Sequence, residues 1–225
     1  REIVLTGVRL GAYGADLRPQ TDLLALCRNI EEGNVLKRLR LSSIEPREVS
    51  DEMIAHMRQS RVLCGHFHIP LQSGDDETLK RMGRDYDRGF FRERVEKIAD
   101  ALPEAAIGID VMTGFPGEDE KAFENTFEFV ESLPVAYLHV FPYSERPGTA
   151  AMKLPDRVPD PVKSLRGRKL RVLGQRKRRA FAQRFLGKTL AVLVEDRRDR
   201  STGMLKGFSR NYVPVLIQKG DSSLV

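Results

Sequence analysis

The sequence predicts an α/β fold built on parallel strands. Five short apolar segments recur along the chain, at residues 3–5, 39–42, 66–69, 107–112 and 137–141. Amphipathic helical patterns lie between them, so strand and helix alternate at intervals of about 30 residues, the length of a βαβ unit. Several such units make either an open doubly wound sheet or a partial barrel, because periodicity does not give the strand order.

Composition limits the class of protein. The 225 residues are 40% hydrophobic, enough for one large core or one core plus a small module. We find no apolar run long enough to span a membrane and no signal peptide pattern, and therefore expect a cytoplasmic protein with no membrane partner. The two cysteines, Cys27 and Cys64, lie far apart with no metal-ligand spacing and are too few for a disulfide framework.

The helices of the alternating part follow from their spacing of apolar residues. The expected helices are residues 23–30, 51–59, 90–102 and 120–133. Thr21 or Asp22 is a suitable N-cap for the first, and Ser50 for the second.

Residues 68–86 are predicted to hold the end of a strand, a turn and a short helix. Pro70 is expected to end the strand, because it lacks the N–H that a sheet ladder needs. Ser73 is the expected N-cap, and the acidic residues 75–77 suit the positive end of the helix dipole. Gln72 and Ser73 would then point at the mouth of the fold, where α/β proteins bind ligands. The alternative is a well-capped turn that binds nothing.

All five strand segments end in small or polar residues. In a parallel barrel these ends gather at one face, and five of them together favour a polar, extended ligand. Taken singly, each is also compatible with ordinary loop chemistry.

The positive charge of the chain is concentrated after a proline-rich connector. A helix is expected over residues 161–185, and residues 161–194 contain many Lys and Arg but no Asp or Glu. Its expected apolar face is formed by Leu165, Val172, Leu173, Phe181 and Phe185. The unopposed charge favours a nucleic-acid partner, and the alternative is a solvated helix face.

The last segment changes character again. Residues 190–194 and 212–217 are expected strands around a Gly-rich, basic centre at 202–212. Aromatic and cationic groups alternate there, an arrangement that suits RNA stacking and phosphate contact, although an aromatic residue in a hairpin also serves packing.

Several motifs together resemble the radical-SAM methylthiotransferases. The segments that carry the resemblance are His68-Ile-Pro-Leu-Gln-Ser-Gly to Tyr86, Asp110-Val-Met-Thr-Gly-Phe-Pro-Gly-Glu118 and Phe141-Pro-Tyr-Ser-Glu-Arg-Pro-Gly-Thr149. Residues 207–212 are similar to the start of a TRAM domain, a small RNA-binding barrel. The resemblance implies a partial radical-SAM (β/α) TIM-like barrel at 1–150, a connector and basic helix at 151–186, and a truncated TRAM-like domain at 187–225.

Residues 2–14 and 40–46 look most like the subgroup that acts on N6-threonylcarbamoyladenosine in tRNA. The resemblance implies addition of a methylthio group to C2 of that nucleoside, next to the anticodon. The implied cofactors are S-adenosylmethionine (SAM) and [4Fe-4S] clusters, and the implied partners are the tRNA anticodon stem-loop and a reductant such as flavodoxin. The alternatives are the isopentenyladenosine subgroup, the ribosomal-protein subgroup, or a non-catalytic RNA-binding barrel that has lost its cluster.

One departure from the family concerns the cysteines. The sequence lacks the family's C-x3-C-x2-C motif, so no metal ligand and no catalytic residue is assigned in it. We expect a fragment, inactive alone, whose cluster motif and N-terminal domain lie before Arg1.

The resemblance also assigns roles by position. The residues placed in the SAM pocket are Thr6, Gly7, Ser42, Ser43, Glu45, Gln72, Ser73, Asp110, Val111, Met112 and Tyr143. The residues placed against substrate or RNA are Arg146, Arg176, Lys177, Arg178, Arg179, Lys206, Phe208, Arg210 and Tyr212. Among them, the carboxylate of Glu45 would suit the ammonium of the methionine end.

Overall fold

The computed structural model describes residues 2–218, so Arg1 and residues 219–225, at the two ends of the predicted domains, lie outside the described residues. All five expected strands are confirmed and all are parallel. They are β1 (Glu2–Leu5), β2 (Arg38–Leu41), β3 (His66–Gln72), β4 (Ala106–Thr113) and β5 (Tyr137–Pro142).

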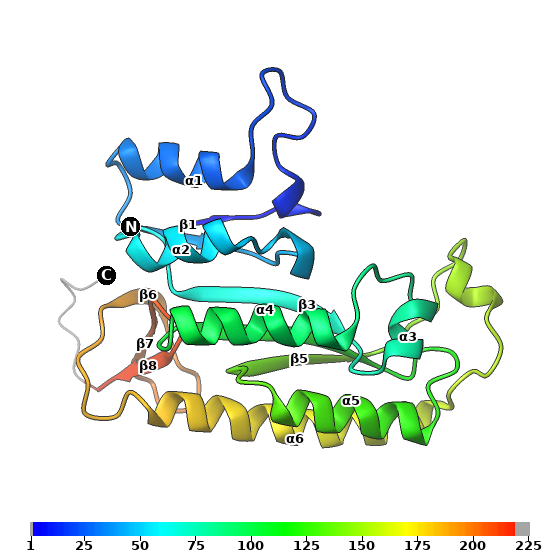
Figure 1. Cartoon of the computed structure of the whole chain (residues 1–225). Helices are drawn as coiled ribbons and strands as arrows, with labels where there is room; N and C mark the ends of the chain where they lie inside the picture. Colours follow the sequence, from blue (N-terminus) through cyan, green and yellow to red (C-terminus); the bar gives the residue numbers. More distant parts are fainter. Residues whose placement is uncertain (1, 219–225) are drawn as a thin grey trace.

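The strands follow one another in space in chain order. β1 pairs with β2, and β3, β4 and β5 form a second ladder in that order. Parallel bridges from Leu39 to Leu63 and from Ser43 to His68 connect the two ladders. A doubly wound sheet needs a reversal of strand order, which is absent from the described strands. The fold is therefore an open, partial barrel (Figure 1). Its five strands, β1 to β5, are here called the parallel layer, and the side of them that faces away from the helices is its interior.

The helices confirm the amphipathic patterns. They are α1 (Leu23–Glu32), α2 (Asp51–Gln59), α3 (Asp76–Arg81), α4 (Arg88–Ala101), α5 (Glu120–Ser132) and α6 (Asp160–Gln183), with short 3-10 turns at Leu10–Ala12, Pro46–Glu48 and Ala150–Lys153. Asp22 caps α1, and Ser50 caps α2, through side-chain oxygens that accept backbone N–H groups. No helix among residues 2–218 is long and apolar enough to cross a membrane.

Two predictions for residues 68–86 were wrong. Pro70 does not end β3, which continues to Gln72 with a register shift against β4 between these two residues. A bulge is one of the places where a sheet accepts proline, since no ladder hydrogen bond is required there. Asp75, not Ser73, is the N-cap of α3 and accepts the N–H of Thr78.

Alternation along β3 separates two environments. Phe67, Ile69 and Leu71 belong to the hydrophobic core shared with the helices. Because side chains alternate across a strand, His66 and His68 project to the opposite side, into the interior of the parallel layer. The interior is thus lined by residues that the helices do not cover.

The predicted apolar face of α6 was right in part. Leu173 and Phe185 are buried as predicted, and so is Leu170, which was not predicted, whereas Leu165 and Val172 are 48% and 65% exposed. Gly174 lies on the buried face, where an added Cβ would sit 3.2 Å from the Cβ of Leu138. Small residues allow the helix to approach β5, so they define the contact face better than the largest apolar side chains do.

The C-terminal segment forms a small antiparallel sheet of β6 (Val192–Arg198), β7 (Leu205–Ser209) and β8 (Pro214–Ile217). The centre at 202–212, expected to separate two strands, instead contains β7. This sheet, here called the C-terminal module, lies at the amino ends of the parallel strands, on the left in Figure 1.

Candidate functional site

The carboxyl ends of the parallel strands form a rim. At this rim, Gln72 combines two unusual features. Its φ is 67°, a left-handed conformation that costs energy for a residue with a side chain. Its Oε1 is buried and has no hydrogen-bond partner among the described residues. A strained backbone and an unsatisfied acceptor at one position make Gln72 a candidate for ligand contact.

The other predicted pocket residues divide into two groups. Ser42, Ser43 and Asp110 line the same cavity, so the structure brings these three residues together. Ser73 is buried against Thr126, with their hydroxyl oxygens 3.2 Å apart, and therefore stabilises the loop.

The remaining rim residues lie outside that cavity. The side chain of Val111 is fully buried in the hydrophobic core, and Glu45 forms an ion pair of 3.4 Å with Arg84. Burial raises the pKa of Glu45, an effect that Arg84 opposes. Tyr143 packs edge-on against Phe115. Thr6, Gly7 and Arg146 are exposed, and Met112 is half-buried.

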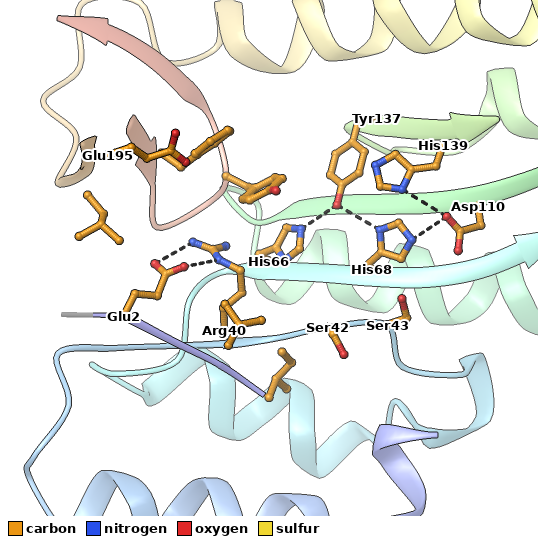
Figure 2. Close-up of a pocket in the computed structure, with 15 residues that line it drawn as sticks. Glu2, Arg40, Ser42, Ser43, His66, His68, Asp110, Tyr137, His139 and Glu195 are labelled. Carbon is orange, nitrogen blue, oxygen red and sulfur yellow. Dashed lines mark hydrogen bonds and ion pairs between the residues drawn. The ribbon is translucent and has the colours of Figure 1, made fainter. Parts of the chain in front are cut away.

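The cavity occupies the interior of the parallel layer and has a volume of about 490 Å³. A connected series of side chains crosses it in Figure 2. His66 Nε2 lies 2.7 Å from the Tyr137 hydroxyl, which lies 3.1 Å from His68 Nδ1. His68 Nε2 lies 2.8 Å from Asp110 Oδ1, and His139 Nδ1 lies 3.4 Å from the same oxygen.

The electrostatics of this series follow from burial. Burial, with the positive charge of Arg40, lowers the pKa of His66 to about 3, so this imidazole is neutral at pH 7. Burial opposes ionisation of Asp110, but contacts with His68 and His139 outweigh it and hold the pKa of Asp110 below its ordinary value. Burial also raises the pKa of Tyr137, which therefore remains a phenol. The series thus connects the Asp110 carboxylate with a neutral imidazole at His66 and a neutral phenol at Tyr137.

Gly108 makes the position of the Tyr137 ring possible. These residues are paired on β4 and β5, and a Cβ at residue 108 would lie 2.0 Å from the Tyr137 ring. Only glycine leaves this space, so β4 admits the ring that links the two histidines of β3.

At the amino ends of the strands, charged groups tie the C-terminal module to the parallel layer. Arg40 donates to Glu2 at 2.8 Å and also to the carbonyl oxygens of Ser209 and Arg210. Arg210 donates in return to the carbonyl oxygens of Lys37, Arg61 and Leu63.

The structure does not gather the predicted RNA residues on one surface. Phe208 and Tyr212 stack on each other, 4.7 Å between ring centroids, and line the interior cavity. Lys206 pairs with Glu195. Arg178 and Arg179 are exposed on α6.

No acidic residue lies between the basic residues of α6 in the sequence, but some of these basic residues pair with acidic side chains or carbonyl oxygens of other segments in the folded chain. Arg176 pairs with Glu131, and Lys177 donates to the carbonyl oxygens of Glu131 and Leu133. Arg166 is buried and forms a 2.8 Å ion pair with Glu118.

Sequence reasoning missed most of the interior groups, namely Glu2, Arg40, His66, His68, Tyr137 and His139. The available signal was the two-residue period: positions 66 and 68, and positions 137 and 139, share one face of their strands. The prediction considered only the residues at the ends of the strands, and therefore did not include these positions within them.

The residues of the chain fit one of the two groups that the resemblance implies and not the other. The iron–sulfur cluster does not fit: the chain has two cysteines, both buried, and burial raises the pKa of Cys27 to about 11, which keeps it a thiol. SAM fits better, because the unsatisfied Gln72 oxygen and the hydroxyls of Ser42 and Ser43 suit its ribose and its amino group.

Parallel strands in chain order, with polar side chains at the rim and in the interior, define an α/β protein with a partial barrel and a cavity inside it. The chain belongs to the radical SAM superfamily, whose sequence profile matches residues 2–130.

Curated relatives carry two names. The chain is 36% identical to the threonylcarbamoyladenosine tRNA methylthiotransferase MtaB of Bacillus subtilis, over 100% of this chain and 50% of that protein. It is 33% identical to the tRNA-2-methylthio-N(6)-dimethylallyladenosine synthase of Pelotomaculum thermopropionicum, with the same coverage. The chain thus spans about half the length of these relatives.

Among solved structures, the chain is similar to coproporphyrinogen III oxidase (HemN) from Escherichia coli, described as a radical SAM enzyme. The TM-score is 0.48 at 20% identity, over 65% of this chain and 32% of that one.

Proposed function

We propose that the chain is the barrel portion of a radical-SAM tRNA methylthiotransferase. The names of the curated relatives support this class, and the rim and interior cavity supply a place for a cofactor and a nucleoside. In this proposal the partners are the tRNA anticodon stem-loop and an electron donor such as a flavodoxin. Residues 151–186 serve as connector and basic helix, and residues 187–225 as a TRAM-like RNA-binding segment.

Bound at the rim, SAM would supply the radical and methyl chemistry of this family. The part of this chain is to hold and orient. Gln72 Oε1 accepts from a ribose hydroxyl, Ser42 and Ser43 bond the amino group or the ribose, and the C-terminal module closes the amino end of the cavity against water. No reaction step is assigned to Cys27 or Cys64.

The finer proposal is that the substrate nucleoside is N6-threonylcarbamoyladenosine. The observation that supports it is a polar section of the cavity wall, where Asp110, His68, His139 and Ser43 face the cavity, while Val4, Leu41, Leu193 and Phe208 line other parts of it. A dimethylallyl group would desolvate these groups without replacing their hydrogen bonds, at a cost of about 1–3 kcal/mol for each group left unsatisfied. The threonylcarbamoyl group has amide, hydroxyl and carboxylate groups that exchange hydrogen bonds with them.

The test compares binding of three anticodon stem-loops to the chain by fluorescence anisotropy. They carry N6-threonylcarbamoyladenosine, N6-dimethylallyladenosine or adenosine at the same position. We expect the first to bind about tenfold tighter or better, since one retained hydrogen bond accounts for about 1.4 kcal/mol. His139→Phe should reduce this preference, and His56→Phe serves as the matched control, because His56 pairs with Glu31 and does not line the cavity.

The outcomes separate the two levels of the proposal. Tighter binding of the dimethylallyl stem-loop would overturn the choice of nucleoside. Binding no tighter than that of a DNA hairpin of equal charge would overturn the tRNA function itself.

A further inference from the structure

Three side chains in the interior present metal-ligating atoms to one point. They are His68, Asp110 and His139, and their ligand atoms all lie within 4.8 Å of one another. They come from β3, β4 and β5, which are adjacent in one ladder. Asp110 and His139 are register partners, so the backbone hydrogen bonds of the sheet fix the spacing of the three groups.

We propose that His68, Asp110 and His139 form a site for a divalent transition-metal ion of the zinc(II) or iron(II) class. Two imidazoles and one carboxylate are the donor set that such ions prefer. Bonds of about 2.0–2.2 Å in a tetrahedral site separate neighbouring ligand atoms by about 3.3 Å. The observed separations of 2.8 and 3.4 Å from Asp110 Oδ1 to the two ring nitrogens are within a small side-chain adjustment of that value.

The surrounding hydrogen bonds orient His68 for this role. A metal-binding histidine usually donates its other ring N–H to a fixed acceptor. His68 Nδ1 faces the Tyr137 hydroxyl at 3.1 Å, which leaves Nε2 directed at Asp110. With the metal bound, His68 Nδ1–H donates to Tyr137, and Tyr137 donates to His66 Nε2. Without it, both hydrogen bonds reverse, so the same three rings serve both states.

The charge around the site is favourable. Among the residues that line the cavity, Arg40 is the cationic side chain, and its charge is paired with Glu2. Three protein ligands leave at least one coordination position open toward the cavity, where an oxygen-bearing ligand can complete the shell.

The site is tested by titrating the tag-free, chelator-treated chain with Co²⁺ and following the visible d–d absorption, then displacing the ion with Zn²⁺. We expect saturation at one equivalent, without the intense sulfur-to-cobalt band that thiolate ligands give. His139→Ala and Asp110→Asn should each weaken binding at least tenfold, since each removes a ligand. Tyr137→Phe should weaken it by about tenfold through loss of the outer hydrogen bond.

His56→Ala is the matched control. His56 Nε2 lies 3.3 Å from Glu31 Oε2 on a different part of the molecule and belongs to no three-ligand group among the described residues. Its replacement should leave the cobalt affinity unchanged. Because His139 is largely exposed, His139→Ala should keep its fold, which circular dichroism verifies. Absence of saturable cobalt binding, or equal affinity in the parent chain and the folded His139→Ala variant, would overturn the proposal.

Discussion

The two ends of the parallel layer use similar residues for opposite purposes. At the amino end, polar groups satisfy one another: Arg40 bonds Glu2 and two carbonyl oxygens, and Arg210 bonds three more. At the carboxyl rim and in the interior, Gln72 Oε1 is unsatisfied and His139 is open to solvent. The comparison teaches that a charged residue alone does not mark a ligand site, because at the amino end such residues are used to fix the C-terminal module to the parallel layer.

The largest expected loss of stability comes from removing Arg40, which connects the amino end of the parallel layer to the C-terminal module. Arg40→Ala removes a buried cation and leaves the Glu2 carboxylate without its main partner, although Arg38 stays within 2.7 Å. Loss of one partner of a buried pair costs about 3–5 kcal/mol, and we expect the lower part of that range because Arg38 remains. Urea unfolding gives the free energy directly.

Arg9→Ala is the control for this change, since Arg9 pairs with Glu48 at 2.8 Å while itself largely exposed. Its free energy of unfolding should not change measurably. Equal losses of unfolding free energy in the two variants would contradict the conclusion that the buried Arg40–Glu2 ion pair stabilises the amino end.

The second prediction concerns the pH dependence of stability, which depends on the buried imidazole of His66. Burial lowers the pKa of His66 to about 3 in the folded chain, against about 6.5 when unfolded. Between these values the unfolded state binds the extra proton, so stability falls as pH decreases below 6.5. From pH 7 to pH 5 this residue accounts for a loss of about 2 kcal/mol.

Urea unfolding at both pH values measures that loss. His66→Gln should flatten the dependence, and His139, whose pKa is also lowered by burial, should leave a residual slope of the same sign. An unchanged slope in His66→Gln would show that His66 is already accessible to protons in the folded chain.

A smaller loss of stability is expected when the space that Gly108 leaves for the Tyr137 ring is filled. Gly108→Ala places a methyl group against the Tyr137 ring and should cost about 1–3 kcal/mol through overpacking. Gly65→Ala is the matched control, because its added Cβ would meet Ala105 at an ordinary 3.7 Å. Thermal unfolding compares the two. Tolerance of Gly108→Ala would mean that the Tyr137 ring is free to leave its position between the histidines.

The sequence predicted the strands, the main helices and the family motifs, because period and capping are local properties. It did not predict the register shift after Pro70 or the role of Gly174, since both depend on the neighbouring strand. The polar rim at Ser42 and Asp110 was predictable from strand ends. The link from His66 through Tyr137 to His68 was not, because it needs the space left by Gly108 on another strand.

The central claim is that SAM binds at the rim and that side chains of the interior contact the substrate nucleoside. A nuclear magnetic resonance titration of the chain tests it most directly. SAM and N6-threonylcarbamoyladenosine are added separately, and the side-chain resonances of Gln72 and of the histidine rings are followed. The account predicts that SAM shifts Gln72 and that the nucleoside shifts His68 and His139. A nucleoside that leaves both rings unchanged and shifts only residues of the basic helix α6 would contradict it.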